Sequence, residues 1–267
     1  MKLVEFKNHH KEILRGILDV CESSNEGILF IHGFERTTIE MKYKVCIDQL
    51  RGGVNLFRFD FSGCGMSDGL FEDLTVEKLK KEVQAGITAF KKEVSGLQKI
   101  HVVAHSLACC VALSLEHEHP DTFERMVFYG PAFNQKELLR YFFVQRCVAD
   151  PSVITWGNYK EFLDEEKFIK AQGLRQRVKA HYVSPAYFLE NANKDYQELF
   201  IGLHHDLQKI LILEAEYDVK VPARSNDKLP EGIKRLHVAK ADHDFERPDV
   251  VEEYLRDVIS FLSHKNE

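Results

Sequence analysis

The chain has 267 residues, of which 44% are hydrophobic and 29% charged, and its net charge is −6. This length suits one α/β domain with a substantial core, or one domain that carries an insertion. Lysine and arginine are dispersed along the chain, which argues against binding to nucleic acid or to an anionic membrane. The N-terminal stretch MKLVEFKNHHKE lacks the apolar core of a signal peptide, and no apolar stretch of about 18 residues follows it. We therefore expect a soluble cytoplasmic protein.

Cysteine and histidine spacing gives no sign of a metal site. The six cysteines lack C-x-x-C spacing and stand in apolar surroundings, so we expect reduced thiols in the core. The pairs His9–His10, His117/His119 and His204–His205 have no further ligands near them in sequence, and we expect them to be solvated. No metal and no cofactor is predicted.

The first part of the chain alternates strands with helices, which is typical of a doubly wound parallel sheet. An edge hairpin is expected from 3–6 and 13–20, buried strands at 27–31 and 54–59, and helices at 40–50 and 75–94, the second capped by Thr75. His32-Gly33-Phe34 follows the first buried strand, and the glycine-rich stretch DFSGCGMSDG follows the second.

The stretch KIHVVAHSLACCVALSL, residues 99–115, places Ser106 between a buried strand and a helix with no room for a loop. A hydroxyl on such a tight junction points out of the carboxyl edge of the sheet, beside the free N–H groups of the helix N-terminus. This is the geometry of a nucleophile elbow. The alternative is an ordinary buried strand and helix that flank a serine by chance.

The alternation stops after a strand at 126–129. Residues 132–206 contain no convincing buried strand, and aromatic-rich helical pieces are expected there at 136–147, 159–172, 185–191 and 196–203. Strands return at 210–213 and 234–238, with helices around 223–228 and at 249–264. The pattern predicts a core of residues 1–131 and 207–267, with a helical insertion, 132–206, between two of its strands.

Two further side chains follow strands of this sheet. Asp218 lies just past the strand at 210–213, and His243 follows the strand at 234–238. Carboxyl ends of parallel strands gather at one edge, where Ser106 is also expected. A serine hydroxyl needs a histidine to accept its proton, and that histidine needs a carboxylate to fix its tautomer. The backbone N–H groups of Phe34 and Leu107 would form the oxyanion hole.

Four blocks carry a resemblance to a known superfamily: HGF at 32–34, RFDFSGCGMSDG at 58–69, AHSLA at 104–108, and LEAEYDVKVP with ADHDF at 213–222 and 241–245. With them the chain resembles the α/β-hydrolases, and is most similar to small bacterial carboxylesterases of the cinnamoyl/feruloyl esterase and serine-aminopeptidase-like group. The resemblance implies an α/β-hydrolase fold, with a mostly parallel doubly wound sheet and a helical cap formed by the insertion.

The chain departs from the family pattern at the elbow and at the glycine-rich turn. Alanine stands at 104 and 108 where the family has glycine, and Leu107 where a polar residue is common. Cys64 replaces a commoner histidine, and we interpret it as packing rather than as a nucleophile. Asp60 is expected to hold its own turn.

The acid has competitors among its neighbours. Asp218 precedes a short apolar turn that ends in proline, as the family's acid does, and is therefore favoured. The competitors either alternate across a strand end or flank the histidine: Glu214, Glu216, Asp242 and Asp244.

The resulting hypothesis is a serine carboxylic-ester hydrolase acting on a small-molecule ester, with catalytic Ser106, Asp218 and His243. Phe143 and Trp156 of the insertion would line an apolar acyl or aryl pocket, although ordinary packing explains most of the aromatic residues there. The alternatives are thioester hydrolysis, C–C bond hydrolysis, perhydrolysis, or a non-catalytic ligand-binding homologue. The substrate is not specified, and a homodimer is left open.

Overall fold

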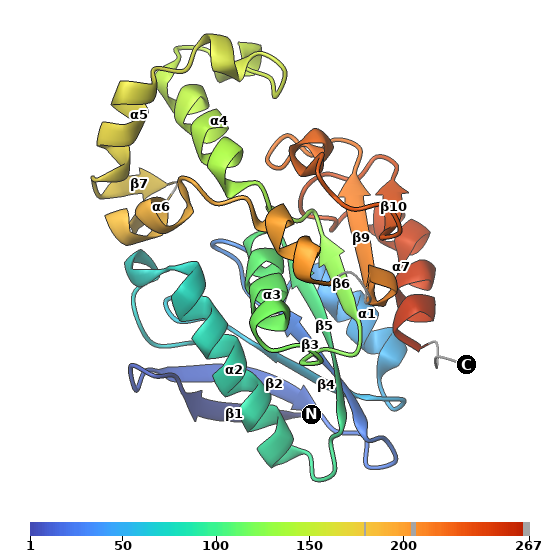
Figure 1. The fold of residues 1–267 in the computed structure, drawn as a ribbon. Helices are drawn as coiled ribbons and strands as arrows, with labels where there is room; N and C mark the ends of the chain where they lie inside the picture. The colour runs from blue at the N-terminus through green and yellow to red at the C-terminus, as the bar shows by residue number, and fades with distance from the viewer. Residues whose placement is uncertain (179, 204–206, 264–267) are drawn as a thin grey trace.

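The computed structural model describes residues 1–178, 180–203 and 207–263, and its centre is an eight-stranded sheet (Figure 1). The strand order is β1-β2-β4-β3-β5-β6-β9-β10. All pairs from β4 to β10 are parallel, whereas β1–β2 and β2–β4 are antiparallel. The strands are β1 Lys2–Lys7, β2 Ile13–Asp19, β3 Glu26–Ile31, β4 Asn55–Phe59, β5 Lys99–His105, β6 Met126–Tyr129, β9 Ile210–Ala215 and β10 Lys234–Val238.

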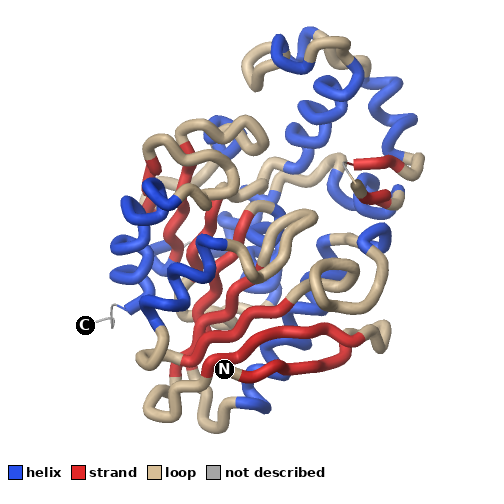
Figure 2. Tube along the Cα trace, turned by 180° about the vertical axis from the view of Figure 1, so that it is seen from behind, coloured by secondary structure: helices blue, strands red, loops and turns tan. Residues whose placement is uncertain are grey.

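Four helices cover the two faces of the sheet, because the central strands are apolar on both sides. One face is covered by α2 and α3, Val76–Glu93 and Leu107–Glu118, and the other by α1 and α7, Met41–Leu50 and Pro248–Ser263. Figure 2 shows α1 and α7 in front of the strands. The side chain of Thr75 accepts a hydrogen bond from the N–H of Lys78, which confirms the predicted cap of α2.

Most of the described residues between β6 and β9 form a separate layer above the carboxyl ends of the strands (Figure 1). Its elements are α4 Gln135–Cys147, α5 Glu165–Gln172, β7 Gln176–Val178, β8 His181–Val183 and α6 Pro185–Asn191, with short 3-10 helices at Pro151–Val153 and Tyr159–Glu161. The 3-10 helix Tyr196–Leu203 lies beside α3. Further 3-10 helices occur at Phe71–Asp73, Leu207–Lys209 and Ala223–Asn226.

Two expectations for this layer were wrong. The predicted helix 159–172 is divided, because the Asp164 side chain accepts a hydrogen bond from the N–H of Lys167 and begins a new helix there. The hairpin of β7 and β8 was missed, since three-residue strands that are mostly not buried carry no periodic pattern. His204, His205 and the predicted helix end at His264 lie outside the described residues.

Two carboxylates are prominent among the contacts that join the layer to the core. Arg175 forms two hydrogen bonds with the Glu72 carboxylate, at 2.5 and 2.6 Å. The carboxylate of Glu190 in α6 accepts hydrogen bonds from the N–H groups of Val76 and Glu77, at 2.6 and 2.9 Å. These amides begin α2, where a negative charge is stabilised by free N–H groups and by the helix dipole.

No helix in the part of the chain that the structure describes is both long and apolar enough to cross a membrane.

Candidate active site

Ser106 lies on a strained turn between β5 and α3. Its φ of 55° is in the left-handed region, which costs free energy for a residue with a Cβ and is characteristic of functional turns. The turn is held from both sides: the N–H of Ser106 donates to the carbonyl of Tyr129, at 2.9 Å, and the N–H of Ala132 donates to the carbonyl of Ser106, at 3.3 Å. Ala104 and Ala108 are both buried, so their methyl groups fit against the elbow.

The structure brings Ser106, His243 and Asp218 together in one line of hydrogen bonds. Nε2 of His243 lies 3.0 Å from Oγ of Ser106, and Nδ1 lies 2.6 Å from Oδ2 of Asp218. The other carboxylate oxygen, Oδ1, accepts the N–H groups of Lys220 and Val221, at 2.9 and 2.7 Å. Asp218 is therefore fixed by three bonds, and its orientation leaves Nε2 of the histidine to face the serine.

Gly130, just after β6, makes room for this contact. A Cβ at this position would lie 3.2 Å from Nδ1 of His243 and 3.3 Å from Oδ2 of Asp218, and φ is +49°. Both facts favour glycine. From the sequence alone this position is recognisable only as a strand end, because the neighbours of Gly130 in space are about 90 to 110 residues away along the chain.

The predicted oxyanion donors belong to two segments that touch. Leu107 is the first residue of α3, so its N–H has no partner within the helix. Gly33, beside Phe34, packs against the elbow: a Cβ there would lie 3.1 Å from Cβ of Ser106. The N–H groups of Phe34 and Leu107 thus come from a loop and a helix N-terminus that meet at the serine.

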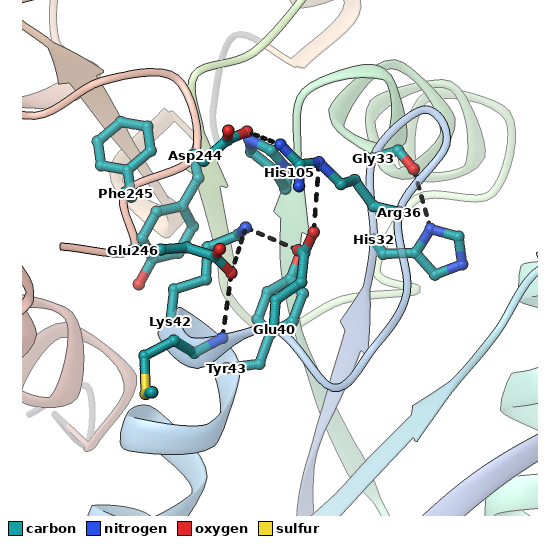
Figure 3. A network of polar contacts seen from close by, with 12 residues as sticks. His32, Gly33, Arg36, Glu40, Lys42, Tyr43, His105, Asp244, Phe245 and Glu246 are labelled. Carbon is teal, nitrogen blue, oxygen red and sulfur yellow. Dashed lines mark hydrogen bonds and ion pairs between the residues drawn. The ribbon is translucent and has the colours of Figure 1, made fainter. Parts of the chain in front are cut away.

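His32 fixes the loop that carries Phe34 (Figure 3). Its Nε2 accepts a hydrogen bond from the N–H of Phe61, at 3.0 Å, so the proton is on Nδ1, which donates to the carbonyl of Gly33, at 2.9 Å. Burial lowers the pKa of His32, which keeps this neutral tautomer. Because the Gly33 carbonyl and the Phe34 N–H share one peptide plane and point in opposite directions, the bond also orients that N–H.

His105, directly before the serine, is a site residue that sequence reasoning missed. Its Nε2 lies 2.8 Å from the backbone carbonyl of His243, and the two rings lie 4.8 Å apart. Nε2 therefore carries the proton. Burial holds the pKa of His105 well below its ordinary value, so the ring is neutral. Its position inside the elbow motif was the available signal.

The glycine-rich turn after β4 is structural. Asp60 accepts hydrogen bonds from the N–H and the hydroxyl of Thr38, at 2.9 and 3.0 Å, and from the N–H of Met66, at 3.0 Å. This confirms the expected structural role of Asp60. Burial raises the pKa of the Cys64 thiol to about 12, which leaves no thiolate to act as a nucleophile at neutral pH. Unlike the other cysteines, Cys147 is exposed, contrary to expectation.

The competing acids have other partners. Glu214 pairs with Arg235 on β10, and Glu216 accepts the N–H of Lys240. Asp242 accepts the N–H of Asp244 inside its own turn. Asp244 forms ion pairs with Arg36 and Lys220.

The two aromatic residues predicted to line a pocket are placed differently. Phe143 is buried and packs against Phe168 within the layer, with ring centroids 5.6 Å apart. Trp156 is half-buried and packs at 5.5 Å from Tyr141, whose hydroxyl lies 3.5 Å from the carbonyl of Val219, next to Asp218. Trp156 is therefore connected to the acid loop, whereas Phe143 belongs to the interior of the layer.

A second aromatic group stands beside the oxyanion loop. The ring of Phe34 lies 4.9 Å from Phe71 and 5.6 Å from Tyr187 of α6. The Tyr187 hydroxyl donates a hydrogen bond to Oε1 of Gln135. The amide nitrogen of Gln135 in turn donates to the carbonyl of Ala132, near the elbow. The position of Tyr187 is thus linked to the serine turn.

Comparisons with known proteins agree with this architecture. Residues 22–177, more than half of the chain, match the family model described as serine aminopeptidase, S33. A curated relative, "Probable lysophospholipase BODYGUARD 2" of Arabidopsis thaliana, is 26% identical over 117 residues, which are 42% of this chain and 24% of that protein. The matched region thus spans about a quarter of the relative's length.

Solved structures match over nearly the whole chain. Est1E from Butyrivibrio proteoclasticus with ferulic acid bound has a TM-score of 0.72 at 17% identity and covers 98% of this chain and 100% of its own. The Pyrococcus furiosus esterase PF2001 has a TM-score of 0.66 at 19% identity and covers 98% and 89%. At these identities the structural likeness shows the fold. By the family match and the fold together, this chain belongs to the serine aminopeptidase S33 family of hydrolases and has the α/β-hydrolase fold.

Proposed function

We propose that the protein is a serine carboxylic-ester hydrolase that works through an acyl-enzyme. The observation that carries the proposal is the line of hydrogen bonds from Ser106 through His243 to Asp218, at 3.0 and 2.6 Å. This is the arrangement in which an imidazole can take a proton from a serine while a carboxylate stabilises the resulting cation.

The steps of acylation follow from these positions. Oγ of Ser106 attacks the acyl carbon, and its proton passes to Nε2 of His243. The carbonyl oxygen becomes an oxyanion and accepts hydrogen bonds from the N–H groups of Phe34 and Leu107. The C–O bond to the alcohol then breaks, and Nε2 returns the proton to the leaving oxygen. The alcohol departs, and the acyl group remains on Ser106.

Deacylation repeats the sequence with water. His243 takes a proton from the attacking water, and the hydroxide oxygen adds to the acyl carbon. When the second oxyanion collapses, the Ser106–acyl bond breaks, Oγ recovers its proton from Nε2, and the carboxylic acid leaves.

The layer that contains α4, α5, α6 and the β7–β8 hairpin supports the proposal that the insertion acts as a cap. It lies above the carboxyl ends of the strands and is fastened to the core beside the oxyanion loop. In this proposal Trp156 on one side, and Phe71 and Tyr187 on the other, contact the acyl or aryl group. Because one similar structure holds ferulic acid, aryl esters belong among the substrates to be tested.

The test is hydrolysis of p-nitrophenyl esters of increasing acyl length and of methyl ferulate. We expect turnover by the wild-type protein and a loss on the order of 10⁶-fold in Ser106→Ala. Ser114→Ala is the matched control, since Ser114 lies in the adjoining helix and both serines are 8% exposed. Activity in Ser106→Ala within about tenfold of wild type would rule the mechanism out.

A further inference from the structure

A network of alternating charges links the loop after β3 to the loops after β9 and β10 (Figure 3). Arg36 forms an ion pair with Asp244, and Asp244 also contacts Nζ of Lys220, at 3.1 Å. On the other side, Nε of Arg36 lies 3.4 Å from Glu40. The network ends in a fully buried lysine: Nζ of Lys42 lies 2.7 Å from Glu40 and 3.8 Å from Glu246.

Each end of the Arg36–Asp244 pair adjoins a residue of the proposed mechanism. Arg36 stands two positions after Phe34, and Asp244 directly follows His243. Lys220, the second cation on Asp244, donates its own backbone N–H to Asp218. Asp244 therefore contacts both the loop with the oxyanion donor and the loop with the acid, and it lies in the loop with the base.

Strand pairing in the sheet does not join the loop after β3 directly to the loop after β10. In the strand order, β3 and β10 are separated by β5, β6 and β9, and β10 is the edge strand, whose one partner among the described residues is β9. The loop after β10 thus has a paired strand on one side only. The ion pair between the side chains of Arg36 and Asp244 joins the loop after β10 directly to the loop after β3.

The surroundings make this link more than a solvated surface pair. The side chains of Arg36 and Asp244 are 27% and 25% exposed, while those of Glu40 and Lys42 are 8% and 0% exposed. Burial of Asp244 opposes ionisation, but Lys220 and Arg36 outweigh it and lower its pKa, so the carboxylate is charged at neutral pH. Removing Asp244 would leave Arg36 with the Glu40 carboxylate, at 3.4 Å from Nε, and would break the ion pair between the two loops.

We infer that Arg36 and Asp244 are positioning residues, which hold His243 and the N–H of Phe34 at the separation that the serine reaction needs. The inference rests on the proposed ester hydrolysis and goes beyond it, since neither side chain touches the reacting atoms. Displacement of a catalytic group by about 1 Å can cost about 10²-fold in rate.

The experiment compares kcat/KM for the methyl and the p-nitrophenyl ester of the same acid. Methoxide must receive a proton from His243 to leave, whereas p-nitrophenolate leaves without one, so a displaced histidine slows the methyl ester more. We expect Asp244→Asn and Arg36→Gln each to lower kcat/KM for the methyl ester by about 10- to 10²-fold, with a smaller loss for the p-nitrophenyl ester. Asp244→Glu, which keeps the charge, should recover part of the difference.

Arg235→Gln is the matched control, because Arg235 and Glu214 form an ion pair between β10 and β9 outside the network. Arg235→Gln should leave the ratio of the kcat/KM values for the two esters unchanged. If Asp244→Asn fails to fold, Lys220→Gln removes the more exposed cation, 41% exposed, and should shift the ratio in the same direction by a smaller factor.

Equal losses for the two esters in Asp244→Asn and Arg36→Gln, or changes no larger than those in Arg235→Gln, would overturn the inference. That result differs from failure of the proposed function, which would appear as hydrolysis that persists in Ser106→Ala. The ester ratio is measured in variants that retain Ser106.

Discussion

Nε2 of His105 donates a hydrogen bond to the backbone carbonyl of His243. The residue directly before Ser106 therefore fixes the backbone of His243. Burial keeps the pKa of His105 well below the ordinary value of 6.5, and it also lowers the pKa of His32. In the unfolded chain both rings are protonated below about pH 6.5. Between the folded and the unfolded pKa, the unfolded state therefore binds more protons than the folded state.

The free energy of unfolding must then decrease as the pH drops below about 6.5, by up to about 1.4 kcal/mol per pH unit for each of these two histidines. Urea unfolding at several pH values between about pH 8 and about pH 5 measures this slope. His105→Gln should have a shallower slope than wild type over that range. Identical slopes would show that His105 is not held neutral by the fold.

Of the three acids Asp218, Glu216 and Asp242, Asp218 should be the one whose loss damages catalysis. Its carboxylate fixes the tautomer of His243, so Asp218→Asn should lower turnover about 10⁴-fold, by analogy with the protease triad. Glu216→Gln and Asp242→Asn should change turnover little, because their carboxylates serve backbone N–H groups of nearby turns. A large loss in either control, with Asp218→Asn active, would move the acid to that residue.

Trp156 and Phe143 should differ in what they control. Phe143 packs inside the layer, so Phe143→Ala should cost about 3–5 kcal/mol of unfolding free energy. Trp156 adjoins Tyr141 and the acid loop, so Trp156→Ala should alter KM and the preference for acyl length or for aryl esters, with a smaller effect on kcat. Unchanged selectivity in Trp156→Ala across the ester panel would remove Trp156 from the substrate pocket.

Glu190 should contribute to stability through the first turn of α2. Glu190→Ala removes the acceptor of two amides and a charge at a helix N-terminus, which should cost about 1 kcal/mol. Because part of this is electrostatic, the cost should shrink at high salt. Glu252→Ala, on the exposed side of α7, is the control for urea unfolding at low and high salt. Equal stability of the two variants would contradict the expected role.

The elements that sequence reasoning predicted best are those with strong local patterns. The buried strands and α2 with its Thr75 cap are examples, since apolar periodicity and one capping side chain determine them. The placement of Ser106, Asp218 and His243 follows from one rule, that parallel strands end at the same edge.

The parts that were missed depend on contacts between distant residues. Gly130 is needed because two side chains from other loops approach it, and Asp244 matters because Arg36 lies across three intervening strands. The helix predicted at 159–172 is divided because Asp164 caps a new helix. An aspartate can also stand inside a helix, so its presence in the sequence does not by itself mark this boundary. None of these contacts produces a periodic pattern of apolar residues that sequence analysis could detect.

The most direct test of the central claim is labelling with a fluorophosphonate probe, followed by mass spectrometry of the modified peptide. An activated serine in hydrogen-bond contact with His243 should form a covalent adduct on Ser106. The adduct should be lost in Ser106→Ala, slowed strongly in His243→Ala, and kept in Ser114→Ala. An unlabelled wild-type protein, or an adduct that persists in Ser106→Ala, would contradict the account.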